Sequence, residues 1–202
     1  MAFVQRHTAS RRAVLRPLRG NGGFTLIEAL IIVTVISIVV GIAIPHVDVK
    51  RFRLNEAVRE VTSTLARAQY RAVLHQYDVV VWFEVTPRRL RVHEDRNNDG
   101  VVQAGEPVTV VPLPDGVVFG RGSAPALPMG PGPVTFKQRF GTPFVTFHRN
   151  GTASEAGGLY LTAVRPAGAP AQAEDTRAVE VERSTGRASW LLHDGSGWKR
   201  GF

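Results

Sequence analysis

The chain has 202 residues, of which 44% are hydrophobic and 21% charged, a composition that suits one modest globular domain plus an anchor. It contains no cysteine, which excludes a disulfide scaffold and means that an exported domain must be held together by a packed core. The formal net charge is +8, but five arginines and no acidic residue precede Gly23, so subtracting them leaves +3 for the remainder. That modest charge alone does not indicate a nucleic-acid partner.

Residues 1–23 form a basic leader that ends in Gly22-Gly23. Its arginines are typical of a positive-inside signal, which would hold the N-terminus in the cytoplasm. Three further basic residues, Lys50, Arg51 and Arg53, follow the next apolar run and oppose this signal, so the charge rule alone leaves the orientation open. The leader arginines are Arg6, Arg11, Arg12, Arg16 and Arg19.

The run from Phe24 to Ile44 is apolar apart from three hydroxyl residues and one carboxylate, Glu28. Its length is close to the roughly 20 residues that span a bilayer. A secretory signal has a short apolar core with small residues after it, whereas here the small residues come first. An ionised side chain in such a segment costs about 2.5–3.5 kcal/mol. We therefore predict a membrane segment, residues 24–45, whose carboxylate has a function.

The stretch Gly23-Phe24-Thr25-Leu26-Ile27-Glu28 resembles the prepilin processing site of type IV pilins and type II secretion pseudopilins. The resemblance implies that prepilin peptidase cuts between Gly23 and Phe24 and that Phe24 is then N-methylated. It also implies that Glu28 meets the N-terminal amine of a neighbouring subunit during assembly, and that Pro45 kinks the helix. The expected partners are other pilin or pseudopilin subunits, the peptidase, the inner-membrane assembly platform, and membrane lipid before assembly.

Residues 46–77 have the pattern of an amphipathic continuation of this helix. Six apolar residues follow a 4-3-4-3-4 spacing that places them on one helical face. We therefore predict one long helix from about residue 24 to about residue 75, bent near Pro45 because proline removes a backbone donor. The six residues are Leu54, Val58, Val61, Leu65, Ala68 and Ala72.

Residues 78–202 have the sequence pattern of a β-rich globular domain, which we expect to lie in the periplasm. Short β-branched and aromatic runs alternate with turn residues, a pattern typical of antiparallel strands. A long helix followed by many short strands predicts an α+β fold with the helix packed on an antiparallel β-sheet, which is also the pilin architecture. The strand candidates are residues 79–85, 89–93, 107–111, 116–119, 144–147, 159–164, 178–183 and 188–193.

Four segments of this domain resemble the C-terminal half of the GspH/FimT group of minor pilins. They are Val145–Ala153, Gly158–Leu161, Val179–Val181 and Thr185–Arg187. The resemblance implies a minor pilin or pseudopilin subunit of a type II secretion pseudopilus or a type IV pilus. Which of these machines uses the protein, and whether the subunit lies at the tip or in the shaft, is left open by the sequence.

A twelve-residue segment that starts at Asp95 and ends at Glu106 fits the calcium-loop pattern D-x-N-x-D-G-x5-E. The ligands would be the side chains of Asp95, Asn97 and Asp99, the Val101 carbonyl and the Glu106 carboxylate. An ion there would order the loop. Strands are predicted on both sides in place of the usual helix pair, so the alternative is an acidic hairpin loop whose Asn, Asp and Gly serve turn chemistry.

Four basic residues near the C-terminus, Arg183, Arg187, Lys199 and Arg200, are candidate DNA contacts. Some members of the minor-pilin group bind DNA during natural transformation, through a Gly-Arg-x-Arg element in the C-terminal hairpin. The corresponding stretch here, Gly186–Ser189, lacks the second arginine. The alternative is a solvated surface with scattered arginines.

The sequence contains no convincing catalytic constellation. The six histidines are scattered, and there is no cysteine nucleophile, serine elbow, P-loop or dinucleotide fingerprint. We predict a protein that is not an enzyme and requires no cofactor, with structural Ca²⁺ as the one candidate ion. The expected localisation is the bacterial inner membrane, as a single-pass protein with its N-terminus in the cytoplasm, and then the filament.

Overall fold

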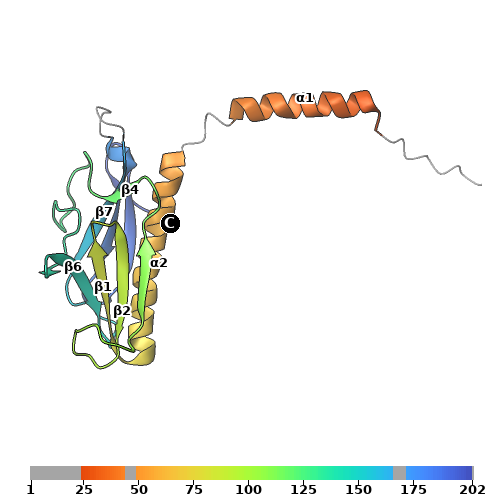
Figure 1. Ribbon diagram of the computed structural model, residues 1–202. Helices are drawn as coiled ribbons and strands as arrows, with labels where there is room; N and C mark the ends of the chain where they lie inside the picture. The colour runs from red at the N-terminus through yellow and green to blue at the C-terminus, as the bar shows by residue number, and fades with distance from the viewer. Residues whose placement is uncertain (1–23, 44–48, 166–171, 202) are drawn as a thin grey trace, which may run out of the picture. The chain divides into compact units, whose positions relative to one another are not determined.

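The computed structural model describes residues 24–43, 49–165 and 172–201 (Figure 1). The chain divides into two compact units, residues 1–47 and residues 48–202. Gly23 and Pro45 lie outside the described residues, so the predicted cleavage site is described on its Phe24 side alone and the predicted kink is not described.

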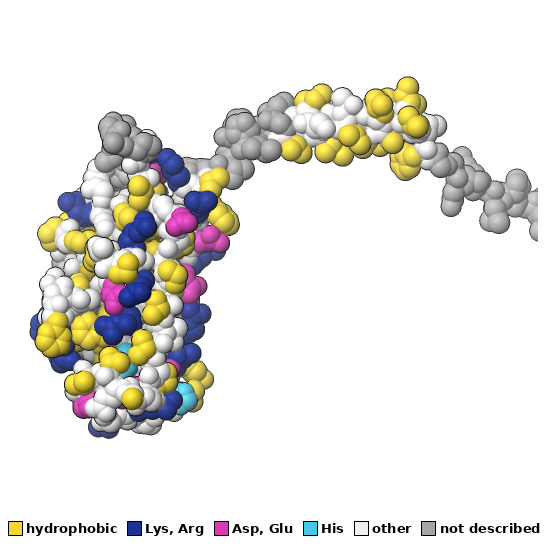
Figure 2. Space-filling model, in the orientation of Figure 1, with side chains coloured by type: hydrophobic (Ala, Val, Ile, Leu, Met, Phe, Trp, Pro, Cys, Tyr) yellow, Lys and Arg dark blue, Asp and Glu magenta, His cyan; other side chains and the backbone are white. Residues whose placement is uncertain are grey.

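The first unit contains helix α1, Leu26–Ala43. Its described side chains are exposed within this chain, and hydrophobic side chains project along its length (Figure 2). The hydroxyls of Thr34 and Ser37 donate hydrogen bonds to the carbonyls of Leu30 and Val33, at 2.7 and 2.8 Å. Their polar atoms therefore have partners inside the helix. Within the described part of the chain, no helix has both the length and the apolar character needed to cross a membrane.

The second unit begins with helix α2, Val49–His75. The predicted apolar stripe is confirmed, because all six of its residues are buried, and Ala57 and Thr64 are buried with them. The predicted single helix is described as two helices, α1 and α2, because the five residues between them lie outside the described part of the chain.

In the described part of the chain, ten strands form two antiparallel sheets of five strands each. The first sheet has the order β3-β2-β1-β6-β5 and the second β10-β9-β8-β7-β4. The first contains β1 Asp78–Glu84, β2 Arg89–Asp95, β3 Val108–Pro112, β5 Gln138–Arg139 and β6 Thr142–Phe147. The second contains β4 Val117–Phe119, β7 Gly157–Ala163, β8 Thr176–Val181, β9 Ala188–His193 and β10 Trp198–Arg200, with the short helix η2 Ala173–Asp175 before β8.

Both sheets pack against α2 and share one hydrophobic core with it (Figure 1). Strand β1 shows how the core is built, because Val79, Val81 and Phe83 are fully buried in it while Trp82 lies on the opposite face. The domain is therefore α+β, with a helix packed on antiparallel β-sheet, as the sequence predicts.

The sequence does not reveal the division into two sheets or the short strands β5 and β10. Trp198 lies in β10, and its indole nitrogen donates to the Pro125 carbonyl at 3.0 Å. The turn before β10 is closed by Asp194, whose carboxylate accepts hydrogen bonds from the backbone nitrogens of Ser196 and Gly197. This local side-chain-to-backbone pairing aligns β10 with β9.

Candidate functional site

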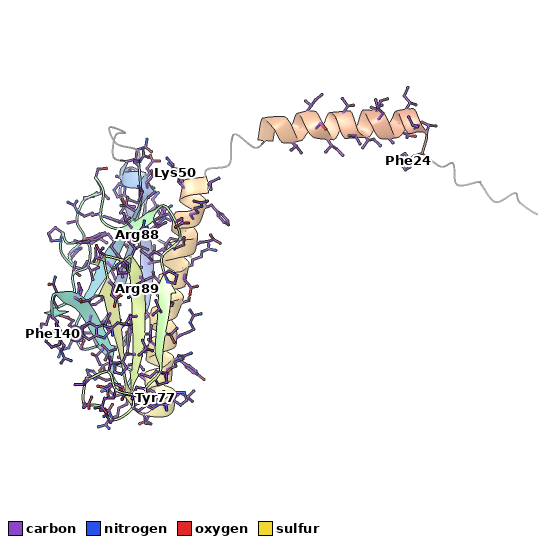
Figure 3. The ribbon with its side chains drawn as sticks, viewed as in Figure 1. Phe24, Lys50, Tyr77, Arg88, Arg89 and Phe140 are labelled. Atoms are coloured by element: carbon purple, nitrogen blue, oxygen red, sulfur yellow. The ribbon has the colours of Figure 1, made fainter. Side chains whose placement is uncertain are left out.

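The start of α1 carries the residues expected to direct processing and assembly. The Thr25 side-chain oxygen accepts a hydrogen bond from the Glu28 backbone nitrogen at 3.3 Å, and the Thr25 carbonyl accepts one from Ala29 at 3.1 Å. This is the arrangement of a helix N-cap. Phe24 therefore lies directly before the helix with its side chain exposed (Figure 3).

Glu28 lies in the first turn of α1, and its carboxylate has no hydrogen-bond or ion-pair partner among the described residues. Its neighbours Leu26 and Ile27 are 84% and 67% exposed within this chain. A helix that is apolar all round is normally buried, either in a membrane or against other helices. In either setting an unpaired carboxylate is costly. The described residues of α1 supply no charged partner that would reduce this cost for Glu28.

The first half of the predicted calcium loop folds around its own polar side chains. Asp95 is buried, and its carboxylate accepts backbone hydrogen bonds from Asp99 and Gly100 at 3.1 and 2.7 Å. Asn97 accepts a second bond from the Asp99 nitrogen at 3.1 Å, and Asp99 accepts one from Val101 at 2.7 Å. The structure thus brings Asp95, Asn97 and Asp99 together in one turn.

Glu106 closes the same loop through a contact that the sequence reasoning missed. One carboxylate oxygen accepts from the Arg96 backbone at 3.0 Å, and the other accepts from Gln103 at 3.0 Å and lies 2.7 Å from His93 Nε2. The hydrogen bond with His93 holds the pKa of Glu106 below its ordinary value. His93 is buried on β2, so the pair fixes the loop to the first sheet.

The side-chain oxygens expected to bind calcium therefore have N–H partners within the protein. Among the described residues, no group of three or more His, Asp or Glu side chains is arranged to hold a metal ion. The calcium site stays a prediction, and binding there would require Glu106 to exchange His93 for the ion. No sequence signal linked His93 to Glu106, because the two lie thirteen positions apart in separate elements.

The four predicted DNA contacts fall into three places. Arg187 and Arg200 line one cavity of about 610 Å³ that also contains Glu180 and Glu182. Arg183 lines a different cavity, beside His148.

Lys199 precedes Arg200 in β10, so its side chain points to the opposite face of the second sheet. There it forms an ion pair with Asp194 that lowers the pKa of that carboxylate. The structure thus brings together two of the four residues, and it places two carboxylates beside them.

Residues 18–44 match the family model of the prokaryotic N-terminal methylation motif. No curated protein and no solved structure matches the chain. The matched range includes Gly23, Phe24 and Glu28 and covers most of α1. The motif suggests membrane anchoring and assembly with other pilin subunits. The N-terminal segment thus carries a type IV pilin-like methylation motif, which indicates a substrate of prepilin peptidase.

Proposed function

We propose that the protein is a minor pilin or pseudopilin of the GspH/FimT type. Prepilin peptidase would hydrolyse the Gly23–Phe24 bond, and the new amine of Phe24 would be methylated. The mature subunit would then assemble into a type II secretion pseudopilus or a type IV pilus. The observation that carries this proposal is Glu28, a carboxylate with no partner in the described residues, inside the matched motif on an exposed apolar helix.

The two units support a division between folding and assembly. The apolar stripe of α2 is already buried inside residues 48–202, so that unit has its own core. The apolar side chains of α1 have no such core. Before assembly, residues 24–45 would anchor the subunit in the inner membrane with the β-rich domain in the periplasm. During assembly, α1 would pack against the equivalent helices of other subunits.

In this proposal an ion pair of Glu28 fixes the position of each subunit relative to its neighbour along the filament axis. In the filament, the N-terminal ammonium of Phe24 from a neighbouring subunit would pair with the Glu28 carboxylate. Pairing offsets the cost of burying both charges, whereas either charge alone would oppose burial. Because both charges lie at the same end of the helix, the pair would set the axial offset between adjacent subunits.

Processing provides a direct test of the proposed cleavage site. We expect the mature chain from cells to begin with N-methylated Phe24, as intact-mass measurement and N-terminal sequencing would show. Gly23→Trp should leave the precursor uncut, because the small residue before the scissile bond is lost, whereas Gly22→Ala should be processed. A mature-size product from Gly23→Trp would refute the assigned site.

The proposed subunit has partners that differ between machines. Crosslinking in intact cells, followed by capture of a tagged full-length chain, would identify them by mass spectrometry. Recovery of secretion pseudopilins and their inner-membrane platform would support the pseudopilus. Recovery of a major pilin with other minor pilins would support the type IV pilus.

DNA binding for natural transformation is the alternative proposal. The observation that favours it is that Arg187 and Arg200 line the same cavity, although Glu180 and Glu182 reduce its positive potential. A gel shift with the full chain in detergent tests it. Salt-sensitive binding that is lost in Arg187→Ala would support a DNA site, and absence of binding at low salt would remove it.

Calcium ordering of the loop is a further proposal that concerns stability. The turn that gathers Asp95, Asn97 and Asp99 supports it. Calorimetric titration with Ca²⁺ should show binding that Asp99→Ala abolishes, accompanied by a rise in unfolding temperature. No heat of binding at millimolar Ca²⁺ would dismiss this site.

A further inference from the structure

A cavity of about 570 Å³ lies on the face of the first sheet that points away from α2. Its walls come from β1, β2, the loop after β2 and the β5–β6 hairpin. This volume falls in the range of about 300–1,000 Å³ that is usual for ligand-binding clefts. The wall residues used below are Trp82, Arg91, Val101, Val102, Arg139 and Phe140.

Phe140 lies at the tip of the β5–β6 hairpin, in a conformation that disfavours a bulky residue. Arg139 pairs with Thr142, and the two residues between them have φ angles of 52° at Phe140 and 75° at Gly141. Asn, Asp or Gly normally occupies such a position, because a Cβ crowds the backbone there. The Phe140 side chain is nevertheless 96% exposed and projects from the margin of the domain (Figure 3). Neither the turn nor the core benefits from an aromatic ring here.

Beside Phe140, two arginines are held against aromatic rings. The Arg91 guanidinium carbon lies 5.3 Å from the centre of the Trp82 ring, and that of Arg139 lies 5.4 Å from the Phe144 ring. Trp82 and Phe144 also contact each other, with ring centres 5.0 Å apart. The four side chains therefore form a continuous stack, which fixes both cations before any ligand arrives.

The charges of this stack are not balanced. Arg91 forms an ion pair with Glu84 at 2.9 Å. Arg139 donates to the Gly100 carbonyl at 2.9 Å but has no carboxylate partner among the described residues. The Trp82 indole nitrogen, on a side chain only 7% exposed, also finds no acceptor in the described part of the chain. Asp99 also lines the cavity, but its carboxylate already accepts hydrogen bonds from Asn97, the Val101 backbone and Gln103. The wall thus offers the Arg139 charge together with exposed apolar surface from Val101 and Val102.

We propose that the cavity and Phe140 form a docking site for a protein partner that presents an apolar side chain next to a carboxylate. The apolar side chain would lie between Val101, Val102 and Phe140, and the carboxylate would pair with Arg139. Aromatic and arginine anchors of this kind dominate the binding energy of interfaces. A second copy of the chain fits less well, because two facing copies would bring their Arg139 side chains together. This inference goes beyond the proposed function and does not depend on it.

The test is selection of random peptides displayed on phage against the full chain in detergent. We expect enrichment of sequences with Phe, Leu or Trp adjacent to Asp or Glu. A synthetic peptide of the enriched sequence should bind wild type and lose at least tenfold in affinity for Phe140→Gly and for Arg139→Gln. Binding should be unchanged in Tyr70→Ser, a matched exposed aromatic on α2.

Stability separates a binding role from a structural one. Glycine adopts φ near 52° without strain, so Phe140→Gly should unfold at the same or a higher temperature than wild type while it loses peptide binding. Enrichment of peptides that lack acidic residues would overturn the proposal. Peptide binding that is retained in both Phe140→Gly and Arg139→Gln would also overturn it. Phe140-dependent binding to phosphatidylglycerol vesicles without peptide selection would assign the site to a membrane surface and equally overturn it.

Discussion

Helices α1 and α2 both contain many apolar residues, yet the structure buries the six-residue apolar stripe of α2 and exposes the described apolar side chains of α1. In α2 the apolar residues follow a helical period, with charged residues on the opposite face, so one stripe fits the two sheets. In α1 they surround the helix and leave it no polar face. The difference shows that α2 completes a core within its own unit, whereas the described apolar side chains of α1 are not covered by this chain.

The same contrast holds for two carboxylates. Glu106 accepts hydrogen bonds from two backbone nitrogens and contacts His93, so its charge is compensated within the domain. Glu28 has no such partner among the described residues. A charge that is compensated inside the fold contributes to its stability, whereas an uncompensated carboxylate on an apolar helix is costly to bury without a partner.

The largest effect on stability should come from shortening a buried side chain of α2. Leu65 is fully buried, and Leu65→Ala should cost about 2–5 kcal/mol of unfolding free energy through lost burial and a residual cavity. The matched change on α1, Ile31→Ala, should leave the unfolding of the domain unchanged because Ile31 is exposed. Urea unfolding of the full chain in detergent, followed by near-ultraviolet circular dichroism, measures both. If both variants lost the same free energy of unfolding, the two helices would contribute equally to the stability of the domain, against this prediction.

A smaller effect should follow the protonation of Glu106. Its pKa lies below the ordinary value of about 4.3, because His93 and two backbone nitrogens stabilise the carboxylate. A group with a lowered pKa stabilises the folded state above its ordinary pKa, and this contribution is lost as the pH falls through the folded value.

We therefore expect the stability advantage of wild type over Glu106→Gln to be constant near neutral pH and to shrink below about pH 4. Thermal unfolding of the two proteins across this pH range measures the difference, and hydrogen exchange at the Arg96 and Gln103 amides locates it. Parallel pH profiles for the two proteins would show that the pair does not stabilise the loop.

The smallest effect on stability is expected at Phe140. Replacement by glycine relieves the strained turn, so the unfolding temperature should rise by a few degrees or stay unchanged. Phe83→Gly, which removes a fully buried ring, should by contrast be strongly destabilising. A marked loss of stability in Phe140→Gly would mean that the ring has a structural role.

Local patterns predicted much of this architecture. The period of the apolar residues in α2 and the short β-branched and aromatic runs bounded by turn residues placed α2, β1 and β8 close to their observed bounds. The division into two sheets was not predictable, because pairing such as β1 with β6 and β7 with β4 joins distant segments. Of the candidate site, the motif around Phe24 and Glu28 was found from sequence and matches a family model.

Other features depended on contacts that have no local signal. The His93–Glu106 pair joins residues whose types gave no hint of proximity, and His93 was one of six scattered histidines. The separation of Lys199 from Arg200 follows from strand alternation in β10, a strand that was missed. The placement of Arg183 in a different cavity likewise had no signal in the sequence. The left-handed conformation of Phe140 runs against the preference of its residue type and was therefore invisible in the sequence.

We propose that α1 is an assembly element whose carboxylate is neutralised by a neighbouring subunit. The most direct measurement is the amount of processed protein in purified filaments for wild type, Glu28→Ala and Glu56→Ala, with Glu56 as an exposed carboxylate on α2. We predict that all three are processed, that Glu56→Ala assembles normally, and that Glu28→Ala is lost from filaments or strongly reduced in them. Normal incorporation of processed Glu28→Ala would contradict the account.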